Sequence, residues 1–287
     1  MRKRVKITEK IAFIFLGITA MVTLVSLLVI VVHVLKEGLP HLSFNYLLDS
    51  PRNMGKDGGI FPTIVGTFWL LITSLFLAVP VGVGAAIYLN EYTKKGLLVR
   101  IIHYFTANLA GIPSIVFGLF GFAFFVVHLK FRWSILSGGL TLALMVLPTI
   151  IRTAEEALAA VPDSYREGSL ALGVTKWQTI KKVVLPTASS GIITGVILGM
   201  GRIVGETAAV YLTVGGALHL PTNIMQPCRP MTLHLYTLAG EGISLSGAYT
   251  TATVLLIGIL VLTVIAQIVG NSFSPWNSGK KGRYNNG

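Results

Sequence analysis

The chain has 287 residues, of which 53% are hydrophobic and only 12% are charged. Soluble domains carry about twice that charged fraction, so the composition excludes an ordinary soluble protein and favours a membrane protein. The net charge of +12 would suit nucleic acid. However, the basic residues gather at the ends of apolar runs, where they determine membrane topology, so no nucleic-acid partner is expected. A single cysteine, Cys228, excludes an internal disulfide and a cysteine metal cluster.

Six apolar runs are long enough to cross a lipid bilayer as helices. They are continuous rather than alternating in polarity, which favours helices over a β-barrel. The predicted fold class is therefore an all-α polytopic membrane protein with six transmembrane helices. The first run is too long for a signal peptide and lacks an A-x-A exit, so an uncleaved helix is expected. The predicted spans are residues 11–35, 61–89, 101–129, 134–151, 191–215 and 248–269.

The basic residues predict the orientation of these spans. With the N-terminus inside, 16 of the 23 Lys and Arg residues lie on the inner side and 6 on the outer side, which favours cytoplasmic termini. The chain then divides into a cytoplasmic N-terminal segment, a first helix with an extracytoplasmic loop, a main membrane domain and a polar cytoplasmic tail that is expected to be disordered. Their ranges are 1–10, 11–62, 63–270 and 271–287.

Two outer segments are long, residues 36–60 and 216–247. They are either surface connections or a contact face for an extracytoplasmic partner, and the sequence leaves both open. The second contains a short predicted helix, M-T-L-H-L-Y-T-L-A-G.

A polar interruption, residues 152–187, separates the fourth and fifth runs. We call it the polar segment. The predicted topology places it in the cytoplasm, where its regular pattern suggests a docking surface for another protein. Residues 164–182 should form two short helices broken near Gly173, because glycine permits positive φ, and Pro186 should end the second one. Trp177 and Ile180, three residues apart, would then share an apolar face, with Trp177 either anchored in a partner or resting at the membrane interface.

Two charged residues lie deep inside a predicted span, Arg202 and Glu206. An unpaired charge at that depth costs between about 2.5 and more than 10 kcal/mol, so intramembrane charges are usually functional. At a spacing of four they would share a helical face and could neutralise one another. Arg202 suits transient binding of a tetrahedral oxyanion, because its planar fork donates paired hydrogen bonds. The other reading is an ion pair that only joins helices. The pair continues a stripe of small or polar residues that should face protein: Gly191, Gly195, Gly199, Ala209 and Thr213.

Motifs for ATP binding and metal binding are absent from the sequence. No G-x-x-x-x-G-K-[ST] loop and no His–Glu metal motif occur. We therefore expect no enzymatic activity, no cofactor and no metal, and any energy source must be another chain.

The polar segment resembles the E-A-A-x3-G-x9-I-x-L-P motif of ABC importer permeases, the membrane subunits of binding-protein-dependent uptake systems. Here the motif begins with Glu167, has Gly173 at its glycine and ends with Val183-Val184-Leu185-Pro186. Gly168 and Ser169 replace the two alanines, and Val183 replaces the isoleucine. The resemblance implies the type I (MetI-like) importer permease fold and a helix set into a groove of the ATPase.

Further stretches are similar to phosphate permeases, in particular to the PstA type: 58–60, 66–67, 108–119 and Arg202-Ile203-Val204-Gly205-Glu206-Thr207. This resemblance implies a PstC-like permease partner, two copies of a PstB-like ATPase, an extracytoplasmic phosphate-binding protein and a lipid bilayer around the chain. Sulfate and molybdate permeases share the Arg-x-x-Gly-Glu arrangement but tend to have another residue at the position of Thr207, so this resemblance favours the phosphate type.

The predicted function is that of a permease subunit for inorganic phosphate, driven by a separate ATPase. The predicted substrate path contains Arg202, Glu206, Thr207 and Ser114, since Ser114 beside Pro113 interrupts the third span. A bend without substrate contact remains an alternative for Ser114. Rival functions are a permease for sulfate, molybdate or tungstate, an ATPase-independent channel or secondary transporter, and a helical scaffold. The predicted ATPase-coupling residues are Glu167, Gly173, Trp177, Val183, Leu185 and Pro186.

Overall fold

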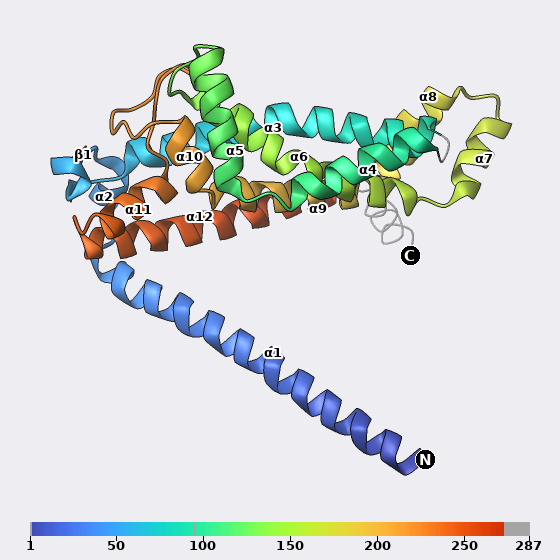
Figure 1. The fold of residues 1–287 in the computed structure, drawn as a ribbon, viewed down its shortest axis with the longest axis horizontal. Coiled ribbons are helices and arrows are strands. Elements are labelled where there is room, and N and C mark those ends of the chain that lie inside the picture. The colour runs from blue at the N-terminus through green and yellow to red at the C-terminus, as the bar shows by residue number, and fades with distance from the viewer. Residues whose placement is uncertain (1, 94–95, 273–287) are drawn as a thin grey trace, which may run out of the picture.

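Long apolar helices run side by side through most of the chain (Figure 1). The computed structural model describes residues 2–93 and 96–272, and residues 273–287 of the predicted tail lie outside this description. The helices are α1 (Arg2–Gly38), α2 (Phe44–Leu48), α3 (Phe61–Ile87), α4 (Leu97–Ala110), α5 (Ser114–Gly121), α6 (Ile135–Ala159), α7 (Asp163–Ala171), α8 (Lys176–Thr179), α9 (Leu185–Val204), α10 (Ala208–Thr213), α11 (Met231–Gly240) and α12 (Leu245–Ser272).

Shorter elements complete the fold. Strands β1 (Pro51–Arg52) and β2 (Asp57–Gly58) form an antiparallel hairpin. Helical 3-10 turns occupy Leu39–His41 and Asn53–Gly55, and π-helical turns extend α3 (Tyr88–Tyr92), α5 (Phe122–His128) and α8 (Ile180–Val184). The bundle has two ends: the β1 end, with the hairpin, α2 and α11, and the α7 end, with α7 and α8 (Figure 1).

Five helical stretches are long and apolar enough to cross a membrane, and a bent pair makes six if it counts as one span. The predicted all-α polytopic fold is therefore confirmed. The five are Ala12–His41, Phe61–Tyr92, Ile135–Ala159, Lys176–Val204 and Leu245–Gly270. The predicted short helix in the segment 216–247 is also confirmed, as α11.

The third predicted span, 101–129, is interrupted at Pro113, as expected, although it begins earlier, at Leu97. It consists of α4 and α5 with its π-turn, which meet at a bend of 100°. Pro113 explains the break, because proline disfavours helical geometry in the residue before it and has no N–H to donate. In Figure 1, α4 runs along the bundle while α5 stands across it.

The fifth predicted span, 191–215, is also wrong in its bounds. The helical stretch begins already at Lys176 and ends at Val204, and α10 follows after residues 205–207. The polar segment is consequently helical at both ends: residues 152–159 complete α6, and residues 176–187 start the helix that becomes α9. Only residues 160–162 and 172–175 connect helices within it.

The core lies where α3, α6 and α9 pack together. It is centred on fully buried residues of α6, which include Leu142, Met145, Val146 and Ile150. Glycines let the helices approach closely: a Cβ on Gly82 of α3 would lie 2.7 Å from Cγ2 of Ile150. By contrast, only the C-terminal part of α1 packs against α12, and the rest of α1 extends away from the bundle (Figure 1).

Candidate functional site

The break between α9 and α10 holds the charged residues that the sequence places in the membrane. Arg202 lies in the last turn of α9, where the negative end of the helix dipole favours a cation. Its side chain is half-buried. Among the described residues, no hydrogen bond or ion pair to the Arg202 guanidinium occurs. The guanidinium therefore keeps its donors available for a ligand.

The expected Arg202–Glu206 pair on one helical face is wrong. Gly205 ends α9, so Glu206 lies outside the helix and its side chain turns to the next one. Glu206 Oε1 accepts a hydrogen bond from the Ala209 N–H, 3.2 Å away in the first turn of α10. The Glu206 carbonyl oxygen accepts from Thr232 Oγ1 at 2.8 Å. Glu206 thus stabilises the break in the manner of a helix cap instead of neutralising Arg202.

The stripe of small residues does face protein, as expected. A Cβ on Gly191 would lie 2.5 Å from Cβ of Ala157, and one on Gly195 would lie 2.7 Å from Cβ of Thr153. Both partners belong to α6. Beyond the break, Ala209 and Thr213 are fully buried. The stripe therefore packs α9 and α10 into the bundle, with Arg202 at the junction.

The second break, at residues 111–113, lies on an element that packs against α10. Ser114 is the first residue of α5, and Thr207 is the N-terminal cap position of α10. Gly118 of α5 packs tightly on α10, because a Cβ there would lie 2.8 Å from Cα of Ala209. Two interrupted helices thus meet within the apolar bundle. Interrupted helices leave backbone polar groups free at membrane depth, as in the binding sites of many transporters.

The polar segment forms two short helices at the α7 end, as expected. Gly173 lies between them with φ of +77°, a conformation that favours glycine, and its N–H donates to the Leu170 carbonyl oxygen at 2.9 Å. Thr175 begins α8 in a capping box with Gln178, in which each side chain accepts from the other's backbone N–H. The turn is therefore defined by local sequence.

The predicted coupling residues of this segment divide into two groups. Glu167, Gly173 and Trp177 are exposed at the α7 end, and Trp177 is 54% exposed. Val183, Leu185 and Pro186 are half-buried and follow the bundle instead. Their neighbour Val184 is fully buried with Leu158 and Ala188 in a small core at this end. The motif's last residues thus anchor the segment, and its first residues face outward.

Two expectations about this segment are wrong. Ile180 does not share an exposed face with Trp177, since it is 1% exposed and points into the bundle. Pro186 does not end the helix, because it lies in the first turn of α9 just after the π-turn. The π-turn at Ile180–Val184 precedes Pro186 and accommodates its missing N–H, whereas the buried face of α8 begins at Thr179 and Ile180 and excludes Trp177.

The residue that holds α7 in place was missed by sequence reasoning. Arg166 Nη2 donates to Glu91 Oε1 at 2.8 Å, and Glu91 lies in the π-turn that ends α3. Arg166 also donates to two carbonyl oxygens at the end of α6, those of Leu158 (2.8 Å) and Val161 (2.6 Å). The only signals in the sequence are the position of Arg166 beside Glu167 and an isolated acid after an apolar run.

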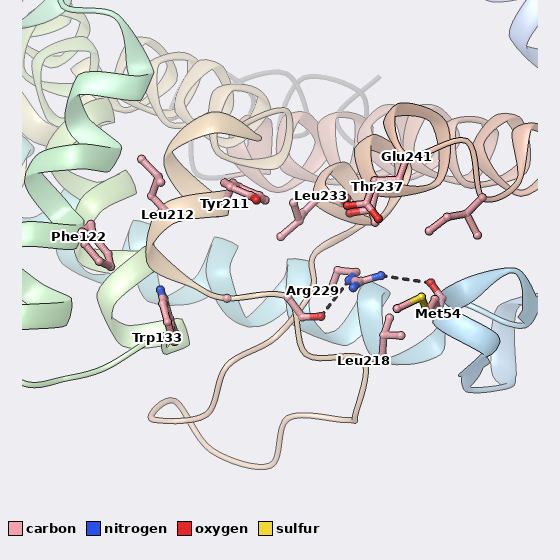
Figure 2. A pocket seen from close by; sticks show the side chains of 13 residues that line it. Met54, Phe122, Trp133, Tyr211, Leu212, Leu218, Arg229, Leu233, Thr237 and Glu241 are labelled. Carbon is pink, nitrogen blue, oxygen red and sulfur yellow. Dashed lines mark hydrogen bonds between the residues drawn. The ribbon is translucent and has the colours of Figure 1, made fainter.

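A cavity of about 680 Å³ opens at the β1 end, and Figure 2 shows its lining. The Arg229 guanidinium points into it, with Nε donating to the Gly216 carbonyl oxygen at 3.0 Å and Nη1 to that of Met54 at 3.4 Å. Burial lowers the pKa of Arg229, and the nearby Glu241 carboxylate partly opposes that shift. Arg229 thus joins the two long segments 36–60 and 216–247 into one face.

His234 packs against Gly55 next to the same face. Its ring is fully buried and neither ring nitrogen has a hydrogen-bond partner among the described residues. Burial, reinforced by the Arg229 charge, lowers its pKa to about 4. A Cβ on Gly55 would lie 2.5 Å from His234 Cε1, so only glycine fits against the ring. Among the described residues, no cluster of three or more His, Cys, Asp or Glu could hold a metal ion.

These features define a class: a polytopic helical transport protein with interrupted helices inside the bundle and an ordered polar segment at one end. Residues 78–277 match the family of binding-protein-dependent transport system inner membrane components. The chain belongs to this family, so it is the membrane component of an ABC importer, and ATP hydrolysis and substrate capture are carried out by other subunits.

Individual relatives agree with this assignment. The chain is 31% identical to a probable ABC transporter permease protein, YqgI of Bacillus subtilis, over 92% of this chain and 96% of that protein. It is 38% identical to the phosphate transport system permease protein PstA 1 of Mycobacterium tuberculosis, over 75% of this chain and 71% of that one. A solved inward-facing structure of the MetNI methionine ABC transporter matches with a TM-score of 0.60 and 21% identity, covering 75% of this chain and 94% of that chain. The fold is that of the MetI-type importer permeases.

Proposed function

We propose that this chain is the PstA-type permease subunit of an ATP-driven importer of inorganic phosphate. The observation that carries the proposal is Arg202, a half-buried guanidinium at a helix break with no carboxylate paired to it among the described residues. An unpaired cation inside an apolar bundle is costly unless an anion visits it. The relatives named as phosphate permeases support phosphate as that anion.

In this proposal the α7 end is cytoplasmic, and the β1 end faces the opposite side. A PstC-like chain completes the pore, a PstB-like ATPase dimer docks on the polar segment, and a phosphate-binding protein contacts the β1 end. Trp177, exposed beside a cavity of about 380 Å³ between α7, α8 and the end of α3, supports the docking role. An exposed indole commonly anchors one protein in a groove of another.

The path for the anion includes Arg202, Thr207 and Ser114, which flank the two breaks, and the helices α5 and α10 that follow these breaks pack on each other. Arg202 binds the anion transiently through its paired donors. Glu206 keeps the break open by capping α10 and adds a negative charge near the path. A transit site of this kind must release what it binds, and a nearby carboxylate weakens the hold of Arg202 on the anion.

Transport by the reconstituted complex tests the proposal. Vesicles that contain both permease chains, the ATPase and the binding protein should accumulate radiolabelled phosphate with ATP and should not accumulate labelled sulfate. Sulfate or molybdate uptake in place of phosphate would support another oxyanion permease. Uptake without the ATPase would support a channel or secondary transporter.

The Arg202→Ala variant tests the path itself. Uptake should fall at least tenfold, about 1.4 kcal/mol of lost stabilisation, while the complex still assembles. Leu198→Ala is a matched control, because Leu198 lies one turn earlier on α9 and is exposed. Normal phosphate uptake by the Arg202→Ala complex would contradict the role of Arg202.

A further inference from the structure

Helix α7 has no apolar anchor in the bundle. None of its residues is buried, and only Arg166 and Ser169 are half-buried. Helices normally keep their place in a protein by burying an apolar face. The position of α7 relative to the spans must therefore depend on the polar contacts of these two side chains and on its short connections.

The two side chains point to different neighbours. Ser169 Oγ lies 3.0 Å from Thr179 Oγ1, so it ties α7 to α8 within the polar segment. Arg166 reaches the bundle instead. Its Nη2 and Nε donate to Glu91 Oε1 at 2.8 and 3.2 Å, and Nη1 donates to Asp163 Oδ1 at 3.1 Å on the first turn of α7. Arg166 is thus the side chain that links α7 to the end of α3.

The ion pair between Arg166 and Glu91 is largely buried, and a lysine could not replace Arg166 in it. The side chains of Arg166 and Glu91 are 17% and 5% exposed. A buried ion pair that loses one partner leaves an uncompensated charge, so it resists opening far more than a surface pair does. Nη1 and Nη2 also bond to the carbonyl oxygens of Val161 and Leu158 at the end of α6. The planar fork therefore fixes three elements at once, which a lysine cannot do.

Glu91 connects this link to the centre of the bundle. It belongs to the π-turn that extends α3, and α3 continues from there as a helix of 27 residues, about 40 Å long. Leu70, Leu71 and Ala78 of α3 pack in the same core as Ile203 and Val204, the residues directly before the break at 205–207. A displacement of α7 can therefore be transmitted by the rigid helix α3 to the residues next to Arg202.

We propose that Arg166 is a positioning residue that transmits the movement of α7 to α3 through the buried carboxylate of Glu91. This inference rests on the proposed docking of the ATPase on the polar segment. It adds that the movement of α7 reaches the membrane-spanning helices through α3 as well as along the continuous helix that leads into α9. A second contact reinforces the route, since the Lys176 ammonium of α8 lies 5.0 Å from the ring centroid of Tyr92 in the same π-turn.

The Glu91→Gln variant tests the link with little change in shape. It keeps the volume and one acceptor oxygen for Arg166 but removes the charge. The ratio of ATPase activity with loaded binding protein to activity without it should fall at least fivefold, while the ATPase still co-purifies with the permease. Arg166→Lys keeps the charge but loses the fork, and it should lie between the parent and Glu91→Gln.

Glu155→Gln is the matched control. Glu155 Oε1 also lies 2.8 Å from a basic partner, His103 Nε2, but that pair joins α4 to α6 and does not touch α7. The same chemical change there should leave the ATPase ratio within about twofold of the parent. An equal loss in both variants would show a general effect of removing carboxylates, and the inference would be overturned.

A distance measurement distinguishes transmission from folding. Cys228, the single cysteine of the chain, is buried, so new cysteines at exposed Leu172 and Tyr88 can be spin-labelled selectively. The distance between these labels should stay constant when an ATP analogue closes the ATPase in the parent, and it should change with the analogue in Glu91→Gln.

The outcomes separate the inference from the docking on which it rests. If ATPase co-purification survives in Glu91→Gln and both the ATPase ratio and the label distance behave as in the parent, the link through α3 is refuted while docking stands. Loss of co-purification in Glu91→Gln would mean that the pair serves assembly, and it would also overturn transmission. If deletion of residues 164–175 leaves ATPase binding intact, the docking proposal fails, and with it this inference.

Discussion

The close packing of α3 on α6 makes a sharp prediction about two glycines on one helix. A Cβ on Gly82 would lie 2.7 Å from Ile150 Cγ2 and 3.1 Å from Ile150 Cβ, whereas a Cβ on Gly84 meets nothing within 4 Å. Both positions are in the interior of α3. Gly82→Ala should therefore destabilise the protein, and Gly84→Ala should not.

The magnitude follows from the contact. Carbon atoms pack at about 3.5–4.0 Å, so the helices or Ile150 must yield by nearly 1 Å. Ile150 is 1% exposed and β-branched, which leaves it little freedom to turn away. Overpacking of this kind costs about 1–3 kcal/mol. Replacing glycine in a helix gains up to about 1 kcal/mol, but this gain is common to both variants. Their difference in unfolding free energy should thus be about 1–3 kcal/mol.

The buried thiol of Cys228 provides the assay. A Cβ on Gly66 of α3 would lie 3.1 Å from Cys228 Sγ, so loosening of α3 exposes the thiol to a fluorogenic maleimide during a temperature ramp. Burial raises the Cys228 pKa to about 12, which keeps the native thiol unreactive near pH 7. Gly82→Ala should react at a temperature about 2–12 °C lower than Gly84→Ala, on the scale of 2–4 °C per kcal/mol. Equal transition temperatures would refute the packing argument.

Three further predictions concern the two ends of the bundle. Gly173→Pro should abolish stimulation of the ATPase by loaded binding protein, because proline cannot adopt a φ of +77°, and retained stimulation would count against the docking role. Trp177→Ala should weaken ATPase co-purification at least tenfold without lowering thermal stability, since Trp177 is exposed; unchanged binding would indicate an indole that only rests at the membrane interface. The pKa of His234 is about 4 in the folded protein and 6.5 when unfolded, so the unfolded state binds more protons between these values. Stability should fall by up to about 1.4 kcal/mol per unit as pH drops from 6.5 to 4, and a His234→Gln variant that keeps the full pH dependence would exclude this origin.

Much of the fold could be predicted from the apolar runs, because the length of an apolar stretch is a direct physical requirement of the bilayer. The break in the third span was expected at Pro113, but its 100° bend and the break in the fifth span could not be predicted in the same way. A run of apolar residues has the same hydropathy whether the helix is straight or interrupted. Pro113 and Gly205 lie at the two breaks. However, proline and glycine also occur inside continuous membrane helices, as Pro80 does in α3 and Pro148 in α6.

The sequence points to individual candidate residues of the site, but it does not predict how these residues are placed relative to one another. Arg202 stands out in the sequence because a charge in an apolar run is exceptional. Its pairing with Glu206 was mispredicted because the spacing of four implies one face only if the helix continues. Likewise, a spacing of three does not decide that Ile180 is buried while Trp177 is exposed, because that depends on which neighbours cover the helix. Arg166 escaped attention because its partner Glu91 is 75 residues away in sequence.

The arrangement of these parts explains why an importer subunit would combine a rigid helix with interrupted ones. The uninterrupted helix α3 runs from the π-turn that holds Glu91 to the core beside Val204, so it can carry a displacement with little loss. The breaks at 111–113 and 205–207 lie where the helices are least constrained by their own hydrogen bonds. Under the proposed mechanism, a displacement delivered there would be absorbed by the breaks and not by the packed glycine face of α9, because close-packed cores have few alternative arrangements. The position of Arg202 directly before one break would then make its exposure to an anion sensitive to the state of the α7 end.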